Sequence, residues 1–355
     1  HDSTSAFLLP AGEGQVKGLQ QQVAACALAV SAPRQGSGGR AACLQQWCPM
    51  KDSLFFAQLS DPHLTTLEQV AWRELVNKRV LGYLSWRRRR RNEHRSEVLD
   101  ALQQDLRQTA PEHIAVTGDL THIGLPAEFR QARGWLEGLG DAERVTVVPG
   151  NHDAYVATSW DDSYAQWREY LESDEPAAGH DGEGVFPSLR ARGPVALIGL
   201  STARPSAPFM ATGSVGNRQL QRFGELLEAT GRQGLFRVVL LHHPPVPGEE
   251  KWRKRLTDAG RLCEVIAAKG AELVLHGHQH RPVQSLIEIP GTHVPVFGIP
   301  SASSIGPHPG RVAQYHLYKV TRADGRWRLD VAVRAYQTDT EVFEEVSNTT
   351  LEISR

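Results

Sequence analysis

Five short groups of acidic, amide and imidazole side chains recur along the chain, and together they could hold metal ions. In chain order they are Asp61-Pro62-His63, Gly118-Asp119, Gly150-Asn151-His152-Asp153, His242-His243-Pro244 and Gly277-His278-Gln279-His280. Carboxylate oxygens mixed with imidazole nitrogens suit Mn, Fe, Zn and similar cations better than Ca or Cu(I). Any one group alone is ordinary turn or surface chemistry. The five in this order favour a metal centre.

Each group follows a short apolar run of strand length. These runs are Leu54–Leu59, His113–Thr117, Val145–Val148, Phe236–Leu241 and Glu272–Leu275, with two further runs at Val195–Leu200 and Val294–Ile299. Segments with apolar residues at helical spacing lie between several of them, at Val98–Leu106, Phe129–Leu139, Leu220–Ala229 and Leu262–Ala268. Ligands gather at the carboxyl ends of strands in open α/β sheets. The alternation therefore predicts an α/β enzyme with all five groups at one edge.

The composition is that of a globular enzyme. Hydrophobic residues make up 40% and charged residues 22% of the 355 residues, and the net charge of −1 gives no strong nucleic-acid signal. No apolar run reaches the length of about 18 residues that a membrane-spanning helix needs. Of four cysteines, three lie in the first 48 residues, which favours a reducing compartment and a cytoplasmic location.

The two ends of the chain differ from its middle. Residues 1–49 lack periodicity and a basic opening region, so we interpret them as a non-native leader before Met50, with a disordered extension as the alternative. We expect one catalytic domain over residues 50–336, whose last part, Val312–Tyr336, alternates with near period two and adds antiparallel strands. Residues 337–355 are then a polar C-terminal tail.

The five groups, complete and in this order, resemble the motifs of the calcineurin-like metallophosphoesterases over roughly Leu54 to Tyr318. The doubled histidine before Pro244 and the compact spacing look most like the bacterial class III cyclic nucleotide phosphodiesterases and their glycerophosphodiesterase relatives. The resemblance implies a four-layer fold of the α/β class, in which two mixed β-sheets pack face to face with helices outside. It also implies a phosphoester hydrolase that uses two divalent metal ions, Mn, Fe or Zn.

The resemblance also implies a role for each motif residue. The first metal ion would be held by Asp61, His63 and His280, and Asp119 would bridge it to a second ion held by Asn151, His242 and His278. His152 would contact the phosphate and help to protonate the leaving oxygen, with Asp153 as its orienting partner. The family's His-x-Pro pattern selects His242 rather than His243 as the ligand.

Phosphodiester hydrolysis explains why such a constellation is useful. Two cations about 3.5–4 Å apart can clamp the attacking and departing oxygens, and water bound to them loses a proton near neutral pH. A neutral amide ligand such as Asn151 keeps the site positive for an anionic substrate. We expect attack by a metal-bridging hydroxide in line with the leaving group, without a covalent enzyme intermediate.

A basic run follows an apolar and aromatic one, because Leu81–Trp86 leads directly into five arginines, Arg87–Arg91. Such a segment can lie on an anionic membrane surface, grip an anionic substrate or touch nucleic acid. The alternative is a solvated helix face whose arginines pair with Glu93 and Glu97. Lys251, Arg253, Lys254 and Arg255 could form a second basic rim. The candidate substrate-binding residues are His122, His243, Arg87 and Arg88. The other histidines, His94 among them, match no motif and are expected to have surface or core roles.

Three classes of function remain open. The first is a phosphodiesterase acting on a cyclic nucleotide or a glycerophosphodiester. The second is a peripheral membrane enzyme that hydrolyses a lipid-linked phosphoester or pyrophosphate, with Trp86–Arg91 on an anionic surface. A phosphomonoesterase or protein phosphatase and a non-catalytic scaffold are weaker alternatives, since a scaffold is expected to lack ligands and none is missing. Nothing in the sequence encodes an oligomeric state.

Overall fold

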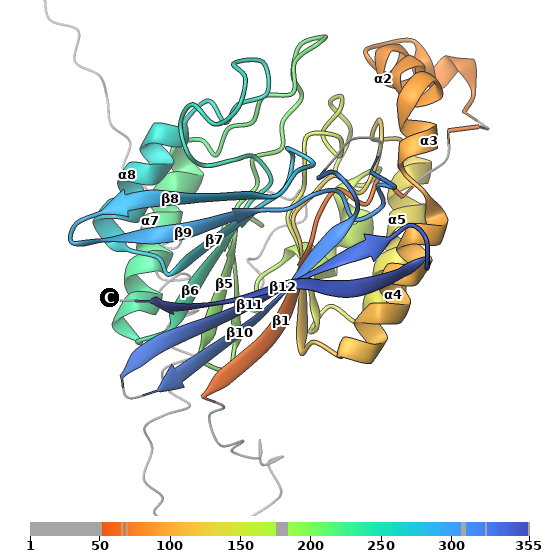
Figure 1. The fold of residues 1–355 in the computed structure, drawn as a ribbon. Helices are drawn as coiled ribbons and strands as arrows, with labels where there is room; N and C mark the ends of the chain where they lie inside the picture. Colours follow the sequence, from red (N-terminus) through yellow and green to blue (C-terminus); the bar gives the residue numbers. More distant parts are fainter. Residues whose placement is uncertain are drawn as a thin grey trace, which may run out of the picture. The chain divides into compact units, whose positions relative to one another are not determined.

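Two six-stranded β-sheets lie at the centre of the structure (Figure 1). The structure is a computed structural model that describes residues 52–64, 67–68, 70–174, 184–306, 310–323 and 325–353. All of them belong to one unit, Pro49–Arg355. The leader predicted at residues 1–49 lies outside the described residues.

The first sheet combines a parallel half with an antiparallel half, in the order β12-β11-β10-β1-β2-β3. The parallel strands are β1 (Ser53–Leu59), β2 (His113–Val116) and β3 (Val145–Val147). The antiparallel strands are β10 (Gln314–Ala323), β11 (Arg326–Gln337) and β12 (Val342–Ile353), and β10 pairs with β1. The first two of these strands confirm the antiparallel strands predicted for Val312–Tyr336.

The second sheet has the order β4-β5-β6-β7-β9-β8. Its inner strands run parallel and are β5 (Val195–Gly199), β6 (Phe236–Leu240), β7 (Leu273–His276) and β9 (Thr292–Gly298). Antiparallel strands close both edges, β4 (Ser188–Arg192) and β8 (Val283–Ile289). Both edge strands lack the continuous apolar run of the inner strands, and the sequence analysis did not predict them.

Helices cover the outer faces of both sheets, as Figure 1 shows. α4 (Ser96–Thr109) and α5 (Pro126–Leu139) lie on the first sheet, and α7 (Asn217–Arg232) and α8 (Ala259–Lys269) on the second. Their apolar residues recur at helical spacing, so each helix buries one face. A separate cluster of buried side chains, including Phe56, Phe236 and Trp327, fills the space between the sheets. The layers are helix, sheet, sheet and helix, which confirms the predicted four-layer fold.

A helical segment between β1 and α4 carries the arginine run. It consists of α2 (Arg79–Ser85), one π-helical turn η2 (Trp86–Arg90) and α3 (Arg91–Glu93), followed by His94, and we call residues 79–94 the inserted segment. Trp86 is buried against Leu67, Ile123 and Leu125. In Figure 1, α2 and α3 stand beside the loops at one end of the sheets. Short helical turns elsewhere are η1 (Trp72–Leu75), η3 (Tyr164–Trp167) and α6 (Arg168–Leu171).

The C-terminal segment corrects one expectation. Residues 337–355 were expected to be a polar tail, but Val342–Ile353 form β12 and pair with β11 along its length. Most β12 side chains are exposed on both faces, so the strand carries no alternation that the sequence could have displayed. Phe343 is the exception, since its side chain is 3% exposed and joins the core under α4. No helix in the described ranges is both long and apolar enough to cross a membrane.

Candidate metal centre

All five motif groups lie in loops that follow the carboxyl ends of parallel strands. β1, β2 and β3 of the first sheet lead into the groups at Asp61, Asp119 and Asn151, and β6 and β7 of the second sheet lead into those at His242 and His278. Backbone hydrogen bonds join neighbouring loops, from Asp61 N to Gly118 O (2.9 Å) and from Gly277 N to His242 O (3.1 Å). The two sheets therefore deliver their polar loops to one place.

The backbone of these loops is strained where the motif side chains converge. Outside glycine, positive φ angles occur at Asp61 (52°), His63 (44°), Asp119 (57°), His278 (71°) and His280 (50°). A side chain in this left-handed region costs free energy, and such residues cluster at functional sites. All five are predicted metal ligands, so the strained backbone conformations occur where side chains are directed into the site.

Two motif glycines leave room for neighbouring ligand side chains. A Cβ atom on Gly118, whose φ is 97°, would come within 2.6 Å of His242 Nδ1. A Cβ atom on Gly150 would overlap the Asp119 carboxylate. Close approach of backbone to side chain is a setting that only glycine tolerates. The Gly-Asp and Gly-Asn-His-Asp spacings therefore follow from packing around the site.

The first cluster of potential ligands comprises Asp61, His63, Asp119 and His280. One donor atom from each lies within 4.8 Å of all the others. His280 Nε2 is 3.1 Å from Asp61 Oδ1. His63 Nδ1 donates to the Thr121 carbonyl (3.0 Å), and its buried Nε2 has no hydrogen-bond partner within the described part of the chain. An imidazole held in this tautomer presents a free lone pair, as a metal ligand must.

The second cluster surrounds His242, which is fully buried. Its Nδ1 donates to the Thr117 carbonyl (2.7 Å), so Nε2 is the nitrogen that carries the lone pair when the ring is neutral, as it is when it binds a metal ion. That Nε2 lies 3.2 Å from Asn151 Oδ1, 3.3 Å from Asp119 Oδ2 and 3.3 Å from His278 Nδ1. Asp119 belongs to both clusters, because it also stands among the donors of the first. The structure thus brings together all seven predicted ligands in two groups that share one carboxylate.

The electrostatics of the site favour cations. Burial alone would raise the pKa of Asp61, but the nearby His280 and His242 imidazoles lower it to about 2. Burial opposes a charge on His242, yet the Asp119 carboxylate raises the pKa of this imidazole to about 9. Both shifts show that positive charge is stabilised between these carboxylates. The donor set and its field therefore fit divalent metal ions.

His243 and His122 do not reach the cavity beside these clusters. His243 is fully buried, with Nδ1 2.8 Å from Thr202 Oγ1 and Nε2 3.2 Å from the Ala211 carbonyl. Its ring therefore supports the loop after β6, and the predicted substrate contact is wrong. His122 is 2% exposed and its ring stacks on that of His63, with centroids 5.0 Å apart. It supports the predicted ligand His63, and it lines a separate cavity of about 320 Å³ with His63 and His94.

The surroundings of His152 differ from those predicted for a proton donor. Its Nδ1 donates to the His122 carbonyl, so Nε2 accepts from Arg90 Nη1 at 2.8 Å. Burial and the Arg90 charge lower the pKa of His152 well below its usual value. A neutral imidazole in this state has no proton to give at Nε2. Arg90, a permanent cation, is the group beside His152 that can donate to a phosphoryl oxygen.

Asp153 was predicted to orient His152, and the structure corrects this. Its carboxylate accepts hydrogen bonds from Asp119 N (3.0 Å), Gly150 N (2.9 Å) and Thr121 N (2.9 Å). Burial and the nearby Asp119 charge raise its pKa, which these donors oppose. Asp153 therefore ties the loop after β2 to the loop after β3 and sets the position of Asp119.

A cavity of about 710 Å³ opens beside the clusters, and its lining revises the assignment of the arginine run. Arg89 and Arg90 line it, together with Asn151, His152 and His278. Arg87 and Arg88, the predicted substrate contacts, are exposed and are not part of this lining. The reason is helical geometry: successive residues of the turn point in different directions, and only some face the site. Of the predicted second rim, Lys251 and Lys254 line the cavity.

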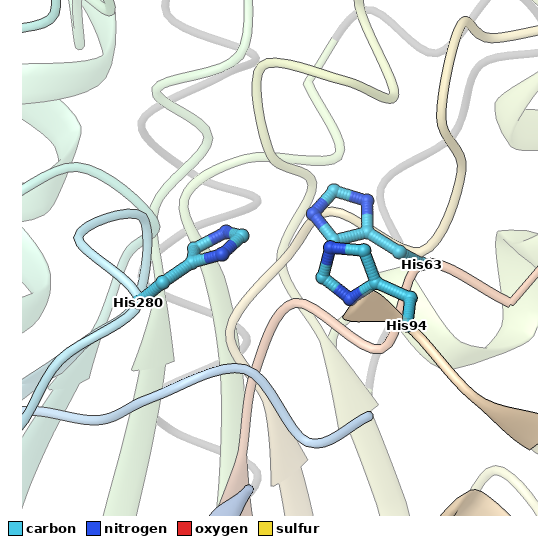
Figure 2. A group of neighbouring side chains, drawn as sticks. All are labelled: His63, His94 and His280. Atoms are coloured by element: carbon cyan, nitrogen blue, oxygen red, sulfur yellow. The ribbon is translucent and has the colours of Figure 1, made fainter. Parts of the chain in front are cut away.

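His94 is the residue at this site that the sequence analysis missed. It lies at the end of the inserted segment, and its ring is 4.5 Å from that of His63 and 5.8 Å from that of His280, measured between centroids. Figure 2 shows the three imidazoles facing a common space. No motif contains His94, and its distance along the chain from the strand ends hid it. The one available signal was its position three residues after the end of the arginine run at Arg91.

Comparison with known proteins identifies the class. A family model described as calcineurin-like phosphoesterase matches residues 56–282, a span that contains both ligand clusters. The chain belongs to the calcineurin-like phosphoesterase family.

Two relatives and one solved structure place the chain within this class. A cAMP/cGMP dual specificity phosphodiesterase of Mycobacterium tuberculosis is 31% identical over 191 residues, which cover 52% of this chain and 52% of that protein. The chain thus spans about half the length of this relative. A probable cyclic nucleotide phosphodiesterase of Synechococcus is 27% identical over 79% of this chain and 92% of that protein. A dimetal phosphatase from Danio rerio shares the fold, with a TM-score of 0.57, 12% identity, and coverage of 85% of this chain and 99% of that one.

Proposed function

We propose that this protein is a phosphodiesterase that works with two divalent metal ions and acts on a cyclic nucleotide or a related small phosphodiester. The observation that carries the proposal is the pair of ligand clusters sharing Asp119. The two curated relatives, both named as cyclic nucleotide phosphodiesterases or probable ones, support the substrate class.

The chain's own residues have distinct tasks in this proposal. Asp61, His63 and His280 would hold one ion, while Asn151, His242 and His278 would hold the other. Bound there, the two ions would supply an activated water and neutralise charge on the phosphoryl group. Hydrogen bonds from His63 and His242 to backbone carbonyls fix the tautomers that such binding requires.

The inserted segment would bind the phosphoryl oxygens that the ions leave free. Arg90 Nη1 lies 2.8 Å from His152 Nε2, and both residues line the cavity next to Asp119. An arginine can donate two parallel hydrogen bonds to a phosphate, which orients the ester as well as attracting it. We therefore assign phosphoryl binding to Arg90 and a supporting contact to His152.

The size and charge of the cavity match a small anionic ester. Its volume of about 710 Å³ falls within the range of roughly 300–1,000 Å³ typical of ligand sites. Arginine and lysine side chains outnumber carboxylates in the lining; the basic ones are Arg89, Arg90, Lys251, Lys254, Arg281 and Arg311. A nucleotide-sized substrate would fit, and this basic rim would attract its charge.

The test is a comparison of two chromogenic esters. Hydrolysis of bis-p-nitrophenyl phosphate and of p-nitrophenyl phosphate is measured on chelated enzyme with and without added Mn²⁺. We expect metal-dependent turnover with preference for the diester, followed by turnover of cyclic AMP or cyclic GMP. Preference for the monoester would keep the metal site and overturn the phosphodiesterase assignment.

An exposed apolar stripe favours a second candidate, a peripheral membrane enzyme that hydrolyses a lipid-linked phosphoester. Within 16 residues before the exposed Arg87 and Arg88 in the chain, several large apolar side chains are open to solvent: Trp72 (72% exposed), Val76 (73%), Val80 (41%) and Leu84 (40%). Val80 and Leu84 are four residues apart in α2 and share a face. Exposed apolar side chains and arginines in one short stretch of the chain suit an anionic lipid surface.

Vesicle binding distinguishes this candidate from the first. Sedimentation with phosphatidylserine–phosphatidylcholine vesicles is compared for the wild type, Trp72→Ser and Arg87→Gln/Arg88→Gln. Each arginine near an anionic surface contributes about 1 kcal/mol, so the double variant should bind roughly 30-fold more weakly. The control is Arg232→Gln, which removes an exposed cation from α7, far along the chain from this stripe. Absence of wild-type binding at low salt would eliminate the lipid-surface candidate.

A further inference from the structure

His94 enters the site from the inserted segment and not from a strand end. It follows α3, and a backbone bridge pairs it with Ser304. Its backbone N–H donates to the Arg90 carbonyl (2.9 Å), and the next residue, Arg95, donates to the Ser303 carbonyl (3.0 Å). The backbone around this histidine is therefore fixed from both sides.

The imidazole of His94 is held in one orientation by a hydroxyl pair. Nδ1 lies 2.8 Å from Ser303 Oγ and 3.3 Å from Ser301 Oγ. Ser301 Oγ in turn donates to the carbonyl of Asp61 (2.6 Å), the first residue of the Asp-Pro-His group. If Nδ1 carries the proton and donates to Ser303, Nε2 is left with a lone pair.

That Nε2 atom is buried and has no hydrogen-bond partner among the residues the structure describes. His94 also forms a group with His63 and His280 in which one ring nitrogen of each lies within 4.8 Å of the other two, and His63 and His280 are shared with the cluster that contains Asp61 and Asp119. In Figure 2 the rings of His63 and His94 face that of His280 across the space between them. A buried polar atom without a partner is costly, so this geometry calls for a ligand.

We propose that His94 Nε2 is a further ligand of the first metal ion, completing a set of three imidazoles with His63 and His280. The inference rests on the proposed metal site, but it does not depend on which ester is hydrolysed. A carboxylate-rich site accepts Mg²⁺ or Mn²⁺, whereas added imidazoles shift preference toward Zn²⁺, Fe²⁺ and Co²⁺. His94 would therefore tune which ion the first site holds.

The arrangement also joins metal binding to substrate binding. Arg90 and His94 stand four residues apart in one helical segment, and they reach His152 and His63 respectively. Movement of this segment would displace both contacts together. The metal ligand at its end thus anchors the arginine that we assign to the phosphoryl group.

In the experiment, Co²⁺ is titrated into protein from which a chelator has removed any metal, and binding is monitored by calorimetry and by visible absorption. His94→Asn is the main variant, because the asparagine amide can replace Nδ1 as the donor to Ser303 while Nε2 is lost. Ser303→Ala is its partner, because it keeps Nε2 and removes the group that orients the ring. His63→Asn identifies which of the two binding steps belongs to the first site.

We expect His94→Asn to lower the Co²⁺ affinity of the first site, identified by His63→Asn, on the order of 100-fold. Ser303→Ala should lower the same affinity about 10-fold, because it removes the hydrogen-bond partner that orients a ligand. The Co²⁺ absorption spectrum should change in His94→Asn because the ion loses a ligand. The other binding step should stay within twofold of wild type.

Wild-type Co²⁺ affinity and an unchanged spectrum in His94→Asn would overturn the inference and leave His94 as a structural ring beside His63. Thermal unfolding of the chelated proteins shows whether the variants fold. If His94→Asn unfolds, an unaltered first step in folded Ser303→Ala overturns the inference instead. If Co²⁺ binding depends on His94 but the wild-type enzyme hydrolyses no phosphodiester, the inference about His94 stands and the proposed function is wrong.

Discussion

The loops that carry the five motif groups, which we call the strand-end loops, line the same cavity as the inserted segment. The two regions are attached to the rest of the fold in different ways. The strand-end loops grow out of two buried sheets, carry strained left-handed residues and are tied together by Asp153. The inserted segment is a run of short helical turns held at a few points. These include the Arg79 side chain, which donates to the Ile123 (3.0 Å) and Gly124 (2.6 Å) carbonyls, and the buried Trp86.

The difference separates two tasks. A rigid edge fixes the ligands, which suits a reaction that needs metal ions at a set spacing. A segment attached at few points can place cationic side chains over a substrate, and His94 at its end is the one proposed ligand that it carries. The comparison predicts that substitutions in the strand-end loops abolish turnover. Arginine substitutions in the inserted segment should lower kcat/KM by an amount that depends on whether the replaced side chain faces the cavity.

The largest effect is expected from Asp119→Asn in the strand-end loops. Asp119 stands in both ligand clusters, so the neutral amide removes the charge shared by the two proposed ions. Turnover of bis-p-nitrophenyl phosphate should fall on the order of 1,000-fold, with loss of bound metal measured by elemental analysis. The control is Asp100→Asn, an exposed carboxylate of α4. A fully metallated and active Asp119→Asn enzyme would refute the shared-carboxylate assignment.

The next effect is stabilisation of the fold by metal. Ions bound at the strand-end loops would join residues from both sheets and relieve repulsion between Asp61 and Asp119. Mn²⁺ at 100 times its dissociation constant should raise the free energy of unfolding by about 2.7 kcal/mol for each ion bound, measured by urea denaturation. The same addition should leave Asp119→Asn unchanged. Equal stabilisation of both proteins would mean that the ion binds elsewhere.

The contrast also explains what could be predicted from the sequence. The seven predicted ligands follow apolar strand-length runs, and parallel strands end at one edge, so the convergence of these side chains could be predicted from their order and spacing. His94 and Arg90 act through helix direction and a contact to Ser303, which depend on tertiary packing. β12 was missed for a related reason, because a solvated edge strand needs no apolar alternation.

An intermediate effect is expected from Arg90→Gln in the inserted segment. Arg90 faces His152 and the cavity, and a hydrogen bond to a charged group contributes about 1.5–3 kcal/mol. The value of kcat/KM for the diester should therefore fall about 10- to 100-fold, while metal content stays at the wild-type level. Arg90→Lys should recover part of the loss, since it keeps the charge but not the paired donors. Loss of metal in Arg90→Gln would show that metal binding at the strand-end loops depends on the arginine of the inserted segment.

The smallest effect is expected two and three residues earlier, in Arg87→Gln/Arg88→Gln. Both side chains are exposed and neither lines the cavity, so solvent and salt screen their charge from the site. Substitutions at such positions change free energies by about 0.5 kcal/mol or less, which is roughly twofold in kcat/KM. Kinetics on bis-p-nitrophenyl phosphate without vesicles, beside Arg90→Gln at the same ionic strength, provide the measurement. A loss of kcat/KM as large as that of Arg90→Gln would mean that the total charge of the segment determines its effect on activity, and not the direction of each side chain. The inserted segment would then differ from the strand-end loops only in how many of the proposed ligands it carries.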